Sequence, residues 1–312
     1  MIRKIFYSIP FAPWLYHTTL ALLGAFLYGF PSRNIYVVGV TGTKGKSTVL
    51  ELIAFILEKA GKKTAVSSSL RNGGSAMTMP GRFFLQRFLR KAVDSGCDYA
   101  LVEVTSQGIV QNRHKFIKWN AVIFTNLSPE HIEAHGSFEL YRDSKVSFFK
   151  YIAQTKNFNP KLFFVNRDDS NAQYFIDAVV GGGEVILYSK SDLCSQLIGE
   201  FNKYNVGAAA AFARSQNISE EIIKKAIAEF SGISGRMEFV QKEPFAVVID
   251  YAHTPDSLCK AYETLRSLNP KAKTPCLPAG KQNPKLICVL GCGGGGRDKW
   301  KRPEMGKIAV QY

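Results

Sequence analysis

The residues that most clearly indicate chemistry lie in segment 34–48 of this 312-residue chain, with the sequence NIYVVGVTGTKGKST. An apolar run, Ile35–Val40, precedes a loop of small residues and lysines, and an amphipathic segment, Val49–Ala60, follows it. Backbone N–H groups in such a loop, and at the start of the next helix, point toward an anion. Lys46 would reach the outer phosphates of a nucleotide, and the Ser47 hydroxyl would ligate Mg²⁺.

The spacing of this loop differs from that of the common phosphate loop. The common pattern has Gly five residues before the G-K pair, where this chain has Val40. The loop instead has the sequence G-T-K-G-K-S. A plain glycine turn between strand and helix is the alternative, and Lys46, Ser47 and the flanking elements argue against it.

Strand and helix patterns alternate from Asn34 onward, which predicts an α/β fold with a mainly parallel sheet covered on both faces. The predicted strands are Ile35–Val40, Lys63–Ser67, Tyr99–Glu103, Ala121–Thr125, Leu162–Asn166 and Glu184–Tyr188. The predicted helices are Val49–Ala60, Gly81–Ser95, Phe138–Ala153 and Ser170–Val179, followed by a largely helical stretch, 201–230.

A hinge at Gly232–Arg236 separates this central P-loop domain from a second α/β unit of Rossmann-like type. That unit has a predicted strand, Phe245–Asp250, a helix, Pro255–Leu268, a second strand, Leu286–Leu290, and a helix that begins near Pro303. One βαβ unit with an unfinished helix cannot complete a doubly wound domain, so we expect a fragment truncated at its C-terminus. The predicted division is an apolar segment 1–33, a central domain 34–232 and an incomplete C-terminal domain 233–312.

The N-terminal segment Trp14–Phe30 is largely apolar and about 17 residues long, at the lower limit for a membrane span. No small-residue cleavage site follows it, so it does not fit a signal peptide. We expect a helix that packs on the protein or contacts a membrane surface through residues 1–30. A spanning helix is the alternative. An exported protein would have little use for a nucleotide site, which favours a cytoplasmic location.

The composition is that of a globular protein, with 46% hydrophobic residues and a net charge of +15. Nucleic acid, a membrane surface or anionic small substrates would each suit this charge. The basic residues are spread along the chain without a basic tail, so we expect no nucleic-acid partner. The six cysteines show no metal-ligand spacing and are interpreted as reduced thiols.

Polar clusters follow several predicted strands, where open α/β sheets bind ligands. Glu103 ends a buried strand and is placed to hold a metal, although an exposed strand-end carboxylate is the alternative. His131 and His135 are four residues apart and would share one helical face; lone surface histidines are equally consistent. Lys145, on a predicted helix, would by itself be interpreted as a solvated surface lysine.

A further set of polar residues combines chemistry suited to a nucleotide. The amides of Asn202 and Asn205 suit a purine edge, and the Arg236 guanidinium suits a phosphate. Asp250 suits a ribose or a metal-bound water, and His253 follows it closely. Each signal is weak by itself.

The order of all these motifs is specific: GTKGKS, E-V-x-S, T-N-L-x-x-x-H, a helical lysine, F-N-x-x-N, G-R-M-E, D-Y-A-H-T-P and G-C-G-G…R-D-K-x-K-R-P. From about Asn34 to Ala309 the chain resembles the ATP-dependent Mur ligases. The resemblance implies an amide ligase of peptidoglycan synthesis that uses ATP and Mg²⁺. Such an enzyme joins an amino acid to a muramyl-peptide carboxylate through an acyl phosphate.

The resemblance also implies roles for individual residues. Catalysis falls to Lys46, Lys145, Glu103 and His131, and the metal ligands are Ser47, Glu103, His131 and Lys145 carbamylated by CO₂ to N6-carboxylysine. ATP would contact Gly42, Thr43, Lys44, Gly45, Lys46, Ser47, Thr48, Asn126, Asn202, Asn205, Arg236, Asp250 and His253. The muramyl-peptide and the amino acid would contact Thr78, Thr105, Ser106, Gln107, Arg113, Arg297, Lys299 and Arg302.

Several features depart from the family pattern. Only about 33 residues precede the first strand, where the family has a domain that binds UDP. The substrate is therefore expected to be lipid-linked at a membrane, or UDP binding to be weak. Of a T-T-P motif, only Thr78 and Pro80 match, and 189–200 is too short for the family's small antiparallel sheet. The motif that selects the amino acid would lie beyond Tyr312.

Other functions compete with this interpretation. A cyanophycin-synthetase-like or amidotransferase-coupled ligase would share the same motifs. A non-catalytic, nucleotide-binding and membrane-associated module belongs to a different class. The presence of Lys145, Glu103 and His131 favours catalysis, because a pure binding protein has no need of a carbamate–metal centre. The sequence does not indicate an oligomeric state.

Overall fold

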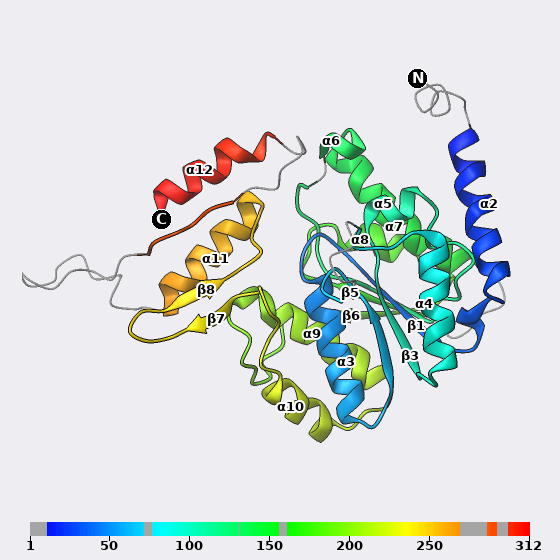
Figure 1. Cartoon of the computed structure of the whole chain (residues 1–312), viewed down its shortest axis with the longest axis horizontal. Helices are drawn as coiled ribbons and strands as arrows, with labels where there is room; N and C mark the ends of the chain where they lie inside the picture. Colours follow the sequence, from blue (N-terminus) through cyan, green and yellow to red (C-terminus); the bar gives the residue numbers. More distant parts are fainter. Residues whose placement is uncertain (1–10, 72–76, 131, 156–160, 269–285, 292–298) are drawn as a thin grey trace, which may run out of the picture.

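A six-stranded parallel sheet, in the order β2-β3-β1-β4-β5-β6, forms the centre of the protein (Figure 1). The computed structural model describes residues 11–71, 77–130, 132–155, 161–268, 286–291 and 299–312. The strands are β1 (Tyr36–Thr41), β2 (Thr64–Ser67), β3 (Tyr99–Glu103), β4 (Ala121–Phe124), β5 (Leu162–Asn166) and β6 (Glu184–Tyr188). The predicted α/β fold class with its parallel sheet is confirmed.

Helices cover both faces of this sheet. One face packs against α3 (Lys46–Lys59), α9 (Glu200–Ser215) and α10 (Glu220–Glu229). The other packs against α4 (Arg82–Asp94), α5 (Ser106–Val110), α7 (Phe138–Gln154) and α8 (Ala172–Asp177), with the short α6 (Ile132–His135) preceding α7. Successive strand residues alternate between the two cores: Val38 and Val40 belong to the first, Val37 to the second.

The strand order determines where a ligand can bind. Strand β1 lies between β3 and β4: the chain first adds β2 and β3 on one side of β1, and then β4, β5 and β6 on the other. Ligands of open α/β sheets bind at such a switch point, beyond the carboxyl ends of the strands. The loop after β1 therefore lies beside Glu103, which ends β3, and Thr125, which follows β4.

The C-terminal elements lie to one side of the central sheet, coloured yellow to red in Figure 1. Strands β7 (Glu238–Gln241) and β8 (Val247–Ile249) form an antiparallel hairpin, and α11 (Pro255–Leu268) packs on α12 (Lys301–Gln311). The two predicted helices are confirmed. The predicted strand Leu286–Leu290 is wrong: this segment is irregular and exposed. Its expected partner, β8, pairs instead with β7, which the sequence reading missed.

The apolar N-terminal segment forms helix α2 (Ala12–Leu27), which packs on α4. Small residues, Ala21, Gly24 and Ala25, make the buried face, while Trp14, Phe26 and other large apolar side chains are exposed. The expected packing on the protein is confirmed. Within the described residues, no helix combines the length and the apolar character that crossing a membrane requires.

One buried histidine makes the fold sensitive to acid. His114 is almost completely buried, and its Nδ1 has no hydrogen-bond partner. Burial, with a smaller effect of Lys115, lowers the pKa of His114 from 6.5 to about 3. Between these two pH values His114 is protonated in the unfolded chain but neutral in the folded protein. The contribution of His114 to the free energy of unfolding is therefore fully present above pH 6.5 and is lost as the pH falls below that value.

We predict that His114→Phe flattens this dependence, because phenylalanine keeps the edge-on ring contacts with Phe148 and Tyr151 but cannot titrate. Urea unfolding at pH 7 and pH 5 measures the effect. As the pH falls within this window, the free energy of unfolding of the wild type should decrease by about 1.4 kcal/mol more per pH unit than that of the variant. Equal losses in the two proteins would contradict the assignment.

Candidate active site at the phosphate loop

Two glycines give the loop between β1 and α3 its shape. Gly42 and Gly45 have φ angles of +143° and +82°, which other residues rarely adopt. A Cβ atom at Gly42 would lie 2.0 Å from Thr125 Oγ1, and one at Gly45 would lie 2.3 Å from Asn205 Oδ1. The loop therefore approaches both the end of β4 and helix α9. Helix α3 begins at Lys46, three residues before the predicted start, so its N-terminus belongs to the loop.

Two residues that follow β4 hold this loop in place. The Thr43 N–H donates to the Asn126 carbonyl at 2.8 Å, and the Lys44 N–H to Asn126 Oδ1 at 2.9 Å. Asn126 Nδ2 and Thr125 Oγ1 donate to the Lys44 carbonyl at 3.1 and 2.7 Å. Asn126, predicted to contact ATP, here orients the loop by hydrogen bonds from its amide and its main chain.

A buried carboxylate faces the start of α3. Glu103 is only 4% exposed, so the alternative of an exposed strand-end carboxylate is wrong. Its Oε2 accepts hydrogen bonds from Ser47 Oγ at 2.9 Å and Ser69 N at 3.0 Å, and its Oε1 lies 3.8 Å from Lys46 Nζ. Lys46 also donates to the Gly42 and Thr43 carbonyls. A buried charge needs such partners, so these contacts fix the positions of both ions.

Lys145 is buried beneath the same loop. Its side chain is 2% exposed, and Nζ donates to the Gly42 carbonyl at 2.9 Å. A solvated surface lysine is therefore excluded. Burial, and then the charge of Lys46, lowers the pKa of Lys145 well below its usual range. A buried amine with a lowered pKa is more readily neutral, and a neutral amine can act as a nucleophile.

The oxygen atoms at this position suit Mg²⁺, which prefers hydroxyl and carboxylate ligands. Ser47 and Glu103 place one of each within 2.9 Å of each other. Among the described residues, His, Cys, Asp and Glu side chains do not gather in threes that could hold a metal. His131, a predicted ligand, lies outside the described residues. Lys145 would become a ligand only if carbamylated, because an ammonium group repels a cation.

The start of α9, the residues before it and the hinge segment line a cavity of about 400 Å³. Asn202 and Arg236 line it, together with Gly232. Asn205 Nδ2 donates to Asn202 Oδ1 at 2.7 Å, which orders the two amides predicted to contact a purine. The Arg236 guanidinium stacks over the Tyr251 ring at 4.1 Å. The structure thus places Asn202 and Arg236 at one cavity and Asn205 in contact with Asn202, while their contact with ATP stays a prediction.

The D-Y-A-H segment also approaches the loop. Asp250 accepts hydrogen bonds from the N–H groups of Met237 and Ala252, at 2.8 and 2.7 Å, and so shapes this turn. His253 Nε2 lies 3.1 Å from Glu130 Oε1, and the same oxygen accepts from Lys44 Nζ at 3.2 Å. The sequence reading missed Glu130. Glu130 directly precedes the predicted ligand at position 131, and this position in the sequence could have indicated a role at the site.

The predicted substrate residues occupy different environments around α5. Thr105 caps α5 by accepting from the Gly108 N–H, and Ser106 Oγ lies 3.0 Å from His135 Nε2. Gln107 is exposed, and Thr78 is half-buried. Buried Arg113 donates to the Met79 carbonyl and, at 2.6 Å, to Gln111 Oε1.

A second arginine, Arg82, which the sequence reading also missed, lies in the same region. It donates to the carbonyls of His17 and Gln111 at 3.1 and 2.6 Å. The Arg82 charge lowers the pKa of Arg113, an effect secondary to burial, and both arginines donate to Gln111. Such a pair suits an anionic substrate group.

The C-terminal residues predicted to face the amino acid are only partly described. Arg297 lies outside the described residues. The Lys299 N–H donates to Glu133 Oε1 at 2.9 Å, which places it beside α6. Arg302 is exposed at the start of α12.

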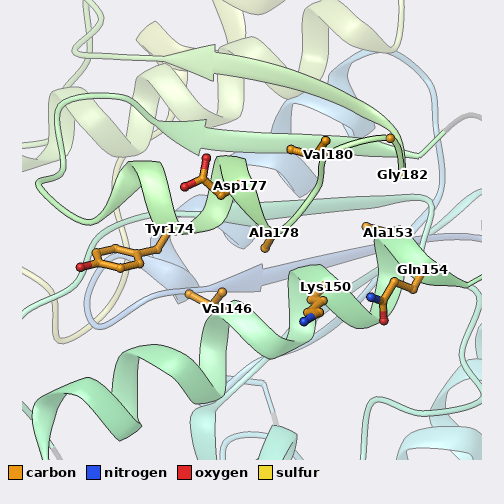
Figure 2. Close-up of a pocket in the computed structure, with 10 residues that line it drawn as sticks. Val146, Lys150, Ala153, Gln154, Tyr174, Asp177, Ala178, Val180 and Gly182 are labelled. Atoms are coloured by element: carbon orange, nitrogen blue, oxygen red, sulfur yellow. The ribbon is translucent and has the colours of Figure 1, made fainter.

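Another cavity, of about 540 Å³, lies between α7 and α8 (Figure 2). Lys150 and Asp177 are its charged lining residues, and Gly182 borders it. Because Gly182 precedes β6, this cavity lies toward the amino ends of the strands, away from the phosphate loop. None of the predicted site residues lines it.

Two family models match the chain. The "Mur ligase middle domain" matches residues 40–194, and the "Mur ligase, glutamate ligase domain" matches residues 235–312. The UDP-N-acetylmuramoyl-L-alanyl-D-glutamate–2,6-diaminopimelate ligase of Syntrophomonas wolfei is 35% identical over 95% of this chain. The matched region makes up 64% of that relative, so the chain spans less than two thirds of its length.

Solved structures agree with this match. The structure of a UDP-N-acetylmuramoyl-L-alanyl-D-glutamate–2,6-diaminopimelate ligase superposes with a TM-score of 0.64 and 26% identity, over 89% of this chain and 60% of its own. A Mycobacterium tuberculosis folylpolyglutamate synthase gives a TM-score of 0.67 at 16% identity, over 80% of this chain and 70% of its own. At that identity the second likeness shows the fold alone.

We predict that Gly45→Ala lowers the affinity for ADP by at least about tenfold, because a Cβ would strain the backbone and displace Asn205 from the loop. Calorimetric titration with ADP measures this affinity. Gly181→Ala is the matched control, since Gly181 has a φ of +73° but nothing within 4 Å of the added Cβ. Unchanged ADP affinity in Gly45→Ala would mean that nucleotide does not bind at this loop.

Proposed function

The chain belongs to the Mur ligase family, and from this premise we propose that it catalyses an ATP-dependent amide ligation in peptidoglycan synthesis. The proposed reaction joins diaminopimelate to the glutamyl carboxylate of UDP-N-acetylmuramoyl-L-alanyl-D-glutamate, as the names of its relatives describe for those proteins. The observation that carries the proposal is that the buried residues Ser47, Glu103 and Lys145 lie with half-buried Lys46 at one phosphate loop.

In this reaction the substrate carboxylate attacks the γ-phosphate of ATP, giving an acyl phosphate and ADP. The amine of the amino acid then attacks the acyl carbon, and phosphate leaves. Lys46 and the N–H groups at the start of α3 would bind the phosphates and neutralise the charge that develops during transfer. Mg²⁺ held by Ser47 and Glu103 would supply further positive charge when bound.

The remaining predicted residues fit this scheme by position. Asn202 and Arg236 border a cavity that suits adenosine, and Asn205 is hydrogen-bonded to Asn202. Ser106 and Arg113, which follow Glu103 in the chain, would hold the muramyl-peptide. The domain boundary at residues 232/233 stays a prediction, supported by the hinge glycine Gly232 with a φ of +107°.

The location and the form of the substrate also remain proposals. An ATP-dependent reaction favours the cytoplasm. The exposed apolar side chains of α2, among them Trp14 and Phe26, would suit contact with a membrane surface and a lipid-linked substrate. If the protein binds the free UDP-linked dipeptide with high affinity, and deletion of residues 1–30 leaves that affinity unchanged, the proposal of a lipid-linked substrate at a membrane is contradicted.

We predict phosphate release that depends on ATP, Mg²⁺, the UDP-linked dipeptide and one amino acid. A panel that includes diaminopimelate, lysine, glutamate and glutamine separates the alternatives, measured by release of inorganic phosphate and by product mass. Diaminopimelate should support the highest rate. Glutamine dependence would indicate an amidotransferase-coupled ligase, and a polymer product a cyanophycin-synthetase-like enzyme. ATP binding without turnover under every condition would favour the non-catalytic module.

We propose in addition that Lys145 is carbamylated by CO₂. Its burial and lowered pKa favour the neutral amine that reacts with CO₂, and the carbamate would give the Mg²⁺ site two more oxygen ligands. Lys145→Ala should lower kcat on the order of 100-fold, and excess acetate should partly restore it by supplying a carboxylate.

The control for this experiment is Lys150→Ala, on the same helix but at the remote cavity, which should leave kcat unchanged. A ¹³C signal of a carbamate after growth or incubation with ¹³C-bicarbonate should be present in the wild type and absent from Lys145→Ala. Full activity of Lys145→Ala without acetate would contradict the proposal.

A further inference from the structure

A single buried carboxylate, Glu130, contacts two segments that are far apart in the sequence. It is 6% exposed and follows β4. Its Oε1 accepts from Lys44 Nζ of the phosphate loop at 3.2 Å and lies 3.1 Å from Nε2 of His253, which belongs to the C-terminal part of the chain. One oxygen atom thus joins the nucleotide loop to the unit that follows the hinge.

The surroundings of this carboxylate give the contact its strength. Removing one partner of a buried ion pair strongly destabilises the folded protein, because the other charge stays buried without a partner. Lys44 is half-buried, and burial lowers its pKa while Glu130 opposes that effect. Glu130 therefore keeps a positive charge stable in the loop where phosphates would bind.

The contact extends from His253 to Arg236. The second ring nitrogen of His253, Nδ1, lies 2.8 Å from the Tyr251 carbonyl, and the two rings pack at 4.6 Å. The Arg236 guanidinium also lies over the Tyr251 ring, 4.1 Å from its centroid. Fixing His253 therefore fixes the aromatic ring on which Arg236 rests.

A second contact supports the same junction. Glu133, three residues after Glu130, accepts a hydrogen bond from the Lys299 N–H at 2.9 Å. The segment after β4 therefore meets the C-terminal unit at two places. The same segment, through Thr125 and Asn126, orients the phosphate loop.

We propose that Glu130 is a positioning residue that couples the phosphate loop to the C-terminal unit, so that Arg236 and His253 are held against a nucleotide bound at the loop. The expected effect of Glu130 on kcat rests on the proposed ligase function. The coupling itself is a property of the two units and can be measured without turnover.

The test is Glu130→Gln in the full chain. A hydrogen bond to a charged group contributes roughly 1.5–3 kcal/mol, so kcat should fall about 10- to 100-fold. The dissociation constant of ADP should change less than about threefold, because the loop N–H groups and Lys46 remain. Hydrogen–deuterium exchange of peptides that cover residues 250–258 should become faster in the variant. Glu229→Gln is the control, since it breaks the exposed pair with Lys59.

A double-mutant cycle tests the route through His253. His253→Gln should reduce kcat, and its effect should nearly disappear in the Glu130→Gln background, because the contact is already lost. Circular dichroism shows whether Glu130→Gln folds. If it does not, His253→Gln removes the other partner of the same contact at a half-buried position, and hydrogen–deuterium exchange of residues 250–258 is measured in that variant.

Three results would overturn the inference. Unchanged exchange of residues 250–258 in both variants would show that the contact does not hold the C-terminal unit. Additive effects in the cycle would show that Glu130 and His253 act separately. A higher Mg²⁺ requirement with unchanged exchange would make Glu130 a metal ligand. Because exchange and ADP binding need no turnover, failure of the ligase proposal would leave this test intact.

Discussion

The site depends on the hydrogen bonds that join the loop after β1 to the residues after β4. Asn126 and Thr125 bind both the N–H and the carbonyl of Lys44, and a carbonyl of Asn126 binds Thr43. These contacts exist because β1 and β4 are parallel neighbours in register, Thr41 opposite Phe124. The loop is therefore ordered before any nucleotide arrives, which lowers the conformational entropy lost on binding.

The charges around this loop explain why an anion should bind there. Two lysines, Lys44 and Lys46, lie within 4 Å of two buried carboxylates, Glu130 and Glu103 respectively. In the low-dielectric interior such groups interact strongly, and the two ammonium groups beside the loop N–H groups favour a polyphosphate. The carboxylates hold the cations apart and in place, and Glu103 with Ser47 also presents oxygen atoms that suit Mg²⁺. One arrangement thus serves both the metal and the phosphates.

The sequence predicted the central part of the molecule well and the C-terminal part less well. Strong apolar strands such as Tyr99–Glu103 and Leu162–Asn166 were located to the residue, because full burial on both faces leaves a continuous hydrophobic run. The segment Leu286–Leu290 has the same composition but is exposed and irregular, since a strand also needs a neighbour. Glu130 was missed because its role arises from long-range contacts, which local patterns do not contain.

The most direct test of the account is a crystal structure of the chain with Mg²⁺ and a non-hydrolysable ATP analogue. The β- and γ-phosphates should lie at the N–H groups of the loop and of Lys46. Mg²⁺ should lie between Ser47 and Glu103, adenine beside Asn202 and Asn205, and Arg236 in contact with the nucleotide. A nucleotide bound elsewhere, or at the loop without any contact from the C-terminal unit, would contradict the proposed site.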